Sequence, residues 1–327
     1  MPTFILRSCL GGLDSILGGL TGPGVHLQKM AKEGYMQRLT ADERILWMDR
    51  FGIEKSILSF PTVSMYMGDE KEVERPKERK KISGFLNDLF EENHAKHPKR
   101  LFFFADVPLT VDVEFSCREL HRATKKRGIK GVAIQSNLGG KLPSDPMFEE
   151  FFREVEGLGL PVFMHPHSPY GKEKMMKYLV YAIVGYTADV SLAATYMILD
   201  GFLERHQDIK IILPHLGGTI PYLYRRLHAC TENDYVPPSM SGKANLSKAP
   251  DEYLKQFYYD TAIGSPLSLE LCLKVSGGSD RILFGSDHPY ISWCEARTID
   301  YLSKTKLTVD ERNNIYSRNA HKLFDLL

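Results

Sequence analysis

Residues 161–166 read PVFMHP and residues 210–217 read KIILPHLG, and these two stretches decide the fold. Each is a short apolar run with the length of a buried β-strand, and a histidine stands at or near its end. Similar runs recur along the whole chain, at residues 55–61, 101–109, 131–136, 257–262 and 282–289. Their recurrence predicts a sheet with seven clear strands.

Longer segments with apolar residues at i, i+3 and i+4 separate these runs, and this spacing predicts helices. The helices are expected at residues 41–51, 77–97, 113–127, 147–158, 188–205 and 268–275. Strands that alternate with helices favour parallel strands joined by crossover helices. An open doubly wound sheet is the alternative, but no Gly-rich phosphate loop follows an early strand. We therefore expect an α/β fold, a (β/α)₈ TIM barrel, whose eighth strand is not evident.

The N-terminal segment differs from the rest of the chain. Residues 1–40 contain Gly11-Gly12, Gly18-Gly19 and Gly22-Pro23-Gly24, and their only strand-like run is residues 3–6. This composition favours a loop or lid over a barrel wall. No linker divides the remainder, so residues 1–327 are expected to form a single barrel domain. Residues 231–250 suit a surface excursion.

Bulk composition limits the class of function. The chain has 327 residues, of which 43% are hydrophobic, with 42 Lys plus Arg against 41 Asp plus Glu. A charge near zero argues against nucleic acid and acidic membranes as partners, and leaves a small molecule as the default. Five scattered cysteines without a C-x-x-C pair indicate neither disulfides nor a zinc ribbon. With no signal sequence and no run expected to span a bilayer, a soluble cytoplasmic protein is predicted.

Titratable side chains stand at the ends of three predicted strands. His165 and His167 lie in MHPHS, His215 lies in LPHLGG, and Asp287 lies in FGSDHP. Active sites of barrels are built at the carboxyl ends of the strands, so these side chains are expected to converge on one mouth.

Imidazole and carboxylate together suit Zn²⁺ or a similar divalent ion. We expect His165 and Asp287 to be metal ligands, and His215 to hydrogen-bond or protonate a reacting oxygen. His167 is a weaker candidate for the same mouth. Arg226, in the helix expected after His215, is a candidate anchor for a substrate carboxylate. A lone histidine at a strand end is more often structural, but three such ends in register favour a site.

These stretches resemble the amidohydrolase-2 branch of the amidohydrolase superfamily, which includes aminocarboxymuconate-semialdehyde decarboxylase and other non-oxidative decarboxylases. The resemblance is carried by residues 48–53 (MDRFGI), 100–105 (RLFFFA), 163–167 (FMHPH), 215–221 (HLGGTIP) and 284–290 (FGSDHPY). Within the branch the chain is most similar to the isoorotate (5-carboxyuracil) decarboxylase type. The resemblance implies zinc, with manganese as an alternative, on His165 and Asp287. It also implies His215 beside the substrate, Tyr290 and Arg226 lining its pocket, and a homodimer.

The chain departs from the family pattern at its start. Family members begin with a strand that ends in His-x-His, or Glu-x-His in some, and this pair completes the metal site. Nothing in residues 1–40 matches it, and His26 is the only histidine before His94. The first strand is therefore expected to be absent or atypical, because the chain is truncated or because the metal site is lost.

Three functions follow from these residues. The first is metal-dependent decarboxylation of an aromatic or pyrimidine carboxylic acid, with Asp287 or a group that it steers as the acid and His215 beside the substrate. The second is hydrolysis of an ester, lactone or amide, in which Asp287 activates a metal-bound water. The third is a truncated or metal-free barrel that binds a ligand without catalysis.

Overall fold

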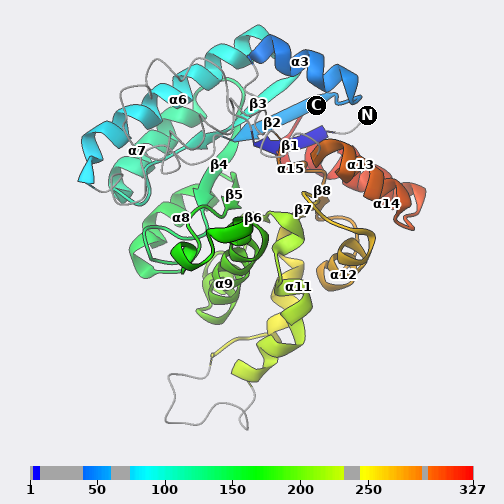
Figure 1. Cartoon of the computed structure of the whole chain (residues 1–327). Coiled ribbons are helices and arrows are strands. Elements are labelled where there is room, and N and C mark those ends of the chain that lie inside the picture. The colour runs from blue at the N-terminus through cyan, green and yellow to red at the C-terminus, as the bar shows by residue number, and fades with distance from the viewer. Residues whose placement is uncertain (1–2, 8–39, 60–73, 232–243, 289–293, 327) are drawn as a thin grey trace.

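Eight parallel strands lie at the centre of the molecule and helices surround them (Figure 1). The computed structural model describes residues 3–7, 40–59, 74–231, 244–288 and 294–326. Each strand pairs with the next one in chain order. The strands are β1 (Thr3–Arg7), β2 (Lys55–Ser59), β3 (Leu101–Asp106), β4 (Ile129–Gln135), β5 (Pro161–His165), β6 (Lys210–Leu213), β7 (Tyr258–Asp260) and β8 (Ile282–Leu283).

The connections between the strands carry the helices, as the alternating pattern predicts. The α-helices are α3 (Ala41–Arg50), α6 (Pro76–Lys96), α7 (Val113–Thr124), α8 (Glu149–Gly157), α9 (Tyr186–Leu199), α10 (Phe202–Arg205), α11 (Ile220–Leu223), α12 (Pro266–Ser276), α13 (Cys294–Lys304), α14 (Val309–Asn313) and α15 (Asn319–Phe324). Shorter 3₁₀ and π turns are η1 (Pro146–Phe148), η2 (Lys172–Lys174), η3 (Lys177–Leu179), η4 (Tyr181–Gly185), η5 (His215–Gly217), η6 (Tyr224–Cys230), η7 (Pro250–Lys255) and η8 (Asn314–Arg318). All six predicted helical segments are present with shifted ends, but the one predicted at residues 188–205 is two helices, α9 and α10, because Gly201 between them has a left-handed φ of 67°.

The first strand is present, so the expectation that it is absent is wrong. The backbone of β1 pairs in parallel with β2, with Thr3 opposite Lys55 and Arg7 opposite Ser59. The run that forms β1 has only five residues and lies in a Gly-rich segment, so the sequence pattern alone did not predict it. Its pairing with β2 identifies it as a strand. The strand is atypical as expected, because its sequence, TFILR, carries no histidine. The loop or lid predicted for the rest of residues 1–40 lies outside the described residues, apart from Thr40, which caps α3.

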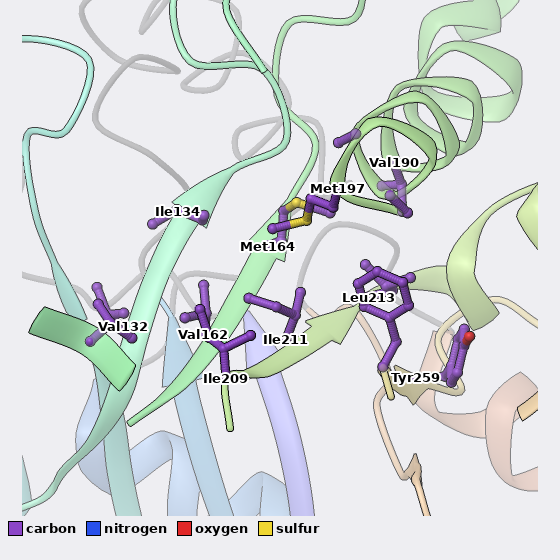
Figure 2. Packing of buried hydrophobic residues seen from close by; sticks show 14 of the residues in the cluster. Val132, Ile134, Val162, Met164, Val190, Met197, Ile209, Ile211, Leu213 and Tyr259 are labelled. Atoms are coloured by element: carbon purple, nitrogen blue, oxygen red, sulfur yellow. The ribbon is translucent and has the colours of Figure 1, made fainter. Parts of the chain in front are cut away.

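Side chains alternate between two faces along the strands. Those on the outer face pack against the helices: Figure 2 shows Met164 of β5 beside Met197 of α9, in the same cluster as Leu213 of β6. Those on the inner face form a second cluster that includes Phe163 of β5. Because residues two apart share a face, His165 continues the inner face at the carboxyl end of β5.

The C-terminal segment fills the opposite end of the interior. Phe324 of α15 is 3% exposed and its ring lies 5.7 Å from that of Phe104. Lys55 at the start of β2 donates to the Leu326 carbonyl at 2.7 Å. α15 also contacts both β1 and β8, the two end strands of the sheet. The segment therefore packs across the seam between these strands, where unpaired edges would otherwise lie open.

One segment contradicts the expectation that no run could span a bilayer. Lys177–Leu199 has 23 residues and includes an 18-residue window with a mean hydropathy of 1.4, so by length and composition alone it could cross a membrane. Within it, α9 buries Val190 and Met197 against the strands (Figure 2). Core packing thus accounts for the apolar character of α9, whereas η3 and η4 carry exposed apolar side chains.

Candidate active site

His165 is the last residue of β5 and is buried, with 4% of its surface exposed. Its Nδ1 lies 2.5 Å from the Pro166 carbonyl oxygen. A carbonyl oxygen can only accept, so the proton of the ring is on Nδ1 and Nε2 carries a lone pair. Within the described part of the chain Nε2 is buried and has no hydrogen-bond partner. A neutral imidazole fixed in this way is the form that binds a metal ion.

His215 lies beside His165, with the two ring centroids 5.5 Å apart. It begins η5 directly after β6, and its backbone φ is 55°. Leu216 has the same φ of 55°, so two successive residues with side chains adopt the left-handed conformation. The predicted strand 210–217 ends early, at Leu213, because these angles cannot continue a strand. Strained backbone of this kind is concentrated at functional sites.

Asp260 is a member of this site that sequence reasoning did not single out. It ends β7, is 3% exposed, and its Oδ1 accepts the backbone N–H groups of His215 at 2.8 Å and Ala262 at 3.0 Å. Burial raises the pKa of its carboxyl, the charge of His215 opposes that rise, and the charge of Asp287 adds to it. The signal was available: Asp260 ends an apolar run, FYYDTA, as His165 ends PVFMH.

Asp287 is half-buried and follows β8 by four residues. Its φ of 59° makes it a third left-handed residue with a side chain at this mouth. Its charge is close enough to influence the pKa of Asp260. Ring contact joins His165 to His215, a hydrogen bond joins His215 to Asp260, and the charge of Asp287 raises the pKa of Asp260. These four residues come from the ends of four successive strands.

The remaining predicted residues differ in where they lie. His167 is 4% exposed and stands two residues beyond His165. Arg226 is exposed on η6. Tyr290 lies outside the described residues.

His288, the neighbour of Asp287, has the opposite arrangement to His165. The Arg44 guanidinium of α3 donates to its Nδ1 at 2.9 Å, so its proton is on Nε2. The ring is fully buried and lies 4.3 Å from the ring of Trp47. Burial, followed by the charge of Arg44, lowers the pKa of His288 to about 2. This neutral histidine packs on α3 and anchors the chain after Asp287 to that helix.

A buried acid lies behind the strand ends. Asp189 of α9 accepts a hydrogen bond from the Ser136 hydroxyl after β4, and the Ser136 N–H donates to the His165 carbonyl at 3.1 Å. Burial raises the pKa of Asp189 to about 6, although the Ser136 bond lowers it. Asp189 therefore supports the backbone that presents His165.

The described residues supply half of a metal site. His165 and Asp287 offer an imidazole nitrogen and a carboxylate, which suit a divalent ion. Among the described residues no group of three or more His, Cys, Asp or Glu side chains is placed to hold a metal. The expected His-x-His pair is missing from the sequence of β1.

Parallel strands wrapped by helices, with histidines and carboxylates at the strand ends, define an α/β barrel of the metal-dependent hydrolase type. The chain belongs to the amidohydrolase family, whose model matches residues 25–326.

Curated relatives include decarboxylases. A 2-amino-3-carboxymuconate-6-semialdehyde decarboxylase of Dictyostelium discoideum is 29% identical over 250 residues, which cover 76% of this chain and 66% of that protein. A gamma-resorcylate decarboxylase of a Rhizobium species is 28% identical over 300 residues, 87% of each chain.

Solved structures share the fold. The 5-carboxyvanillate decarboxylase of Sphingomonas paucimobilis matches with a TM-score of 0.82 at 22% identity, over all of both chains. The IDCase of Metarhizium anisopliae matches with a TM-score of 0.79 at 22% identity, over 100% of this chain and 97% of that one. A 5-carboxyvanillate decarboxylase of Novosphingobium aromaticivorans, solved with bound manganese, matches with a TM-score of 0.81 at 21% identity, over 99% and 97%.

Proposed function

We propose that this chain is a metal-dependent non-oxidative decarboxylase of an aromatic or pyrimidine carboxylic acid. The observation that carries the proposal is His165, whose buried imidazole lies beside the His215 ring and whose Nε2 has no hydrogen-bond partner among the described residues. The decarboxylases among its relatives support the same reaction class.

His165 and Asp287 are the proposed protein ligands of a divalent ion. Imidazole and carboxylate suit zinc, and manganese is the ion in one solved relative. When bound, the ion polarises an oxygen of the substrate. Two protein ligands hold zinc weakly, so this proposal requires a further ligand beyond these two.

The side chains have distinct proposed roles in the reaction. Decarboxylation places a proton on the ring carbon that loses CO₂, and no electrons are exchanged with a redox cofactor. Asp287 is the proposed acid that supplies this proton. His215, whose backbone Asp260 holds, hydrogen-bonds the substrate. His167, Arg226 and Tyr290 are proposed to contact the substrate, with Arg226 as the carboxylate anchor.

Two other functions use the same residues. A hydrolase would use Asp287 to activate a water against an ester, lactone or amide. A metal-free barrel would bind a carboxylated ligand without turnover, and the missing His-x-His pair favours this reading.

The test combines metal content with turnover. The purified chain is loaded with Mn²⁺ or Zn²⁺, its metal is counted by mass spectrometry, and CO₂ release is followed with 2,6-dihydroxybenzoate, 5-carboxyvanillate and 5-carboxyuracil. We expect about one ion per chain, lost in His165→Ala and Asp287→Ala. His215→Asn should keep the ion and lose about 100-fold or more in kcat. His228→Asn is the matched control, because His228 pairs with Asp251 at 2.8 Å on η6.

Other outcomes decide between the remaining functions. Release of p-nitrophenol from p-nitrophenyl acetate without CO₂ release from any acid would favour the hydrolase. A parent chain that holds no metal but binds 2,6-dihydroxybenzoate by calorimetry would favour the metal-free barrel.

We also propose that the chain is one barrel domain that works as a soluble, cytoplasmic homodimer. Apolar side chains gather on the segment after η2: Tyr178 is 77% exposed, Ile183 67% and Met176 54%. Large exposed apolar patches mark contact surfaces, and a second copy is the proposed occupant.

A further inference from the structure

The turn that carries His215 requires an external hold. His215 and Leu216 both have φ of 55°, and Gly217 and Gly218 follow with φ of 80° and 65°. Left-handed residues with side chains are strained, and such a conformation persists only where the surroundings fix it.

Asp260 provides a direct contact to this turn. Its Oδ1 accepts the His215 N–H at 2.8 Å, and the same atom accepts the N–H of Ala262 at 3.0 Å. Hydrogen bonds to a carboxylate are about twice as strong as those between neutral groups. The bond to Ala262 ties the carboxylate to its own strand, so Asp260 cannot turn away from His215 without losing both bonds.

The surroundings leave Asp260 little freedom to move. Its side chain is 3% exposed. On one side, a Cβ added at Gly285 would come within 2.9 Å of the Asp260 Cβ, so the backbone two residues after β8 lies close against the Asp260 side chain. On the far side of the turn, a Cβ added at Gly218 would come within 2.3 Å of the Thr187 carbonyl oxygen of α9. The turn is thus enclosed between β7 and α9.

We propose that Asp260 is a positioning residue, whose carboxylate holds the His215 turn in its left-handed conformation and so keeps the imidazole beside the His165 ring. The catalytic part of this inference rests on the proposed decarboxylase function. The structural part, that Asp260 fixes the conformation of the His215 turn, does not depend on that function.

Two variants separate the hydrogen bond from the fold. Asp260→Asn keeps an oxygen that accepts the His215 N–H, whereas Asp260→Ala removes the acceptor. In the Mn²⁺-loaded chain with 2,6-dihydroxybenzoate we expect Asp260→Ala to lower kcat by about 100-fold and Asp260→Asn by less than about 10-fold, with KM within about threefold in both. The matched control is Asp106→Asn, a buried acid (6% exposed) bound by Arg79 and Ser83 of α6. This control should reduce stability and leave kcat within about threefold.

The rate of amide hydrogen exchange at residues 213–218 measures how firmly the His215 turn is held, and it does not depend on catalysis. Exchange of the His215 amide should be about 10-fold faster in Asp260→Ala than in the parent, and close to parental in Asp260→Asn and Asp106→Asn. An unchanged exchange rate of the His215 amide in Asp260→Ala would show that Asp260 does not hold the turn, whether or not the chain decarboxylates.

The positioning role is tested by kcat if the parent chain is active. It is overturned if Asp260→Ala keeps kcat within threefold of the parent. It is also overturned if Asp260→Asn or Asp106→Asn loses as much kcat as Asp260→Ala. A parent without turnover removes the proposed function and leaves the exchange result as the test of the hold.

Discussion

Two buried histidines at the carboxyl ends of β5 and β8 have opposite tautomers because their partners differ. The Nδ1–H of His165 donates to a carbonyl oxygen, whereas the Arg44 guanidinium donates to Nδ1 of His288. His165 therefore presents a lone pair at Nε2, and His288 an N–H. At the scale of single residues, the hydrogen-bond partner decides which histidine is suited to a metal.

The first prediction concerns Asp189 and the pH dependence of stability. Burial raises the pKa of its carboxyl from 3.8 to about 6, so the folded chain keeps a proton that the unfolded chain releases near pH 3.8. The stabilising contribution is present below pH 3.8 and is lost as pH rises through about 6. Asp189→Asn mimics the protonated form. The free energy of unfolding of the parent should therefore fall by about 1 kcal/mol relative to Asp189→Asn between pH 5 and pH 8.

Urea denaturation at the two pH values measures this difference. Asp208→Asn is the control, since Asp208 is exposed and should follow the parent at both values. Equal slopes with pH for the parent and Asp189→Asn would contradict the prediction.

At the scale of elements, α15 and the residues after it complete the interior. Alternate residues of the strands point inward, and the short α15 supplies Ala320, Leu323 and Phe324 to the same cluster. α15 is the last part of a continuous helical segment, residues 309–324, and its buried side chains hold that segment against the barrel. The sheet and the C-terminal helix therefore depend on each other.

The second prediction tests this dependence. Phe324→Ala should lower the free energy of unfolding by about 3–5 kcal/mol, because it empties a buried site against Phe104. Val309→Ala, at a position 77% exposed on α14, should change it by less than about 0.5 kcal/mol. Thermal and urea unfolding measure both. A loss below 1 kcal/mol in Phe324→Ala would mean that α15 is not part of the cooperative core.

At the scale of the whole molecule, the apolar segment after β5 has two faces with different roles. α9 turns Val190 and Met197 into the core, while Tyr178 and Ile183 lie exposed on η3 and η4. Tyr178 and Ile183 are not buried within one chain, so their burial against a second copy would stabilise a dimer.

The third prediction follows from this proposed interface. The parent should sediment as a dimer, and Ile183→Asp should shift it to the monomer because a charge at an apolar interface is costly. Leu267→Asp, 78% exposed on α12, is the control and should leave the dimer intact. A monomeric parent that binds anionic phospholipid vesicles would contradict the dimer and assign this face to a membrane.

Much of the fold follows from local pattern. Apolar runs of strand length alternate with segments of 3.6-residue apolar period from residue 41 onward. This spacing is a property of the local sequence, so it can be recognised without knowing the tertiary contacts. The end of β6 was misjudged, because the left-handed angles of His215 and Leu216 depend on Asp260, which is 45 residues away. The strand β1 was taken for loop because five residues without a partner carry too little signal.

The sequence by itself determined the alternating α/β architecture and the placing of His165, His215 and Asp287 at the ends of core strands, which are β5, β6 and β8. It did so because strand period and strand-end position are local properties. Only the tertiary structure decided that Asp260 accepts the His215 N–H, that Nε2 carries a lone pair in His165 and a proton in His288, and that α15 fills the interior. These features depend on contacts between residues far apart in the chain, and such contacts exist only once the strands have curled around a common axis.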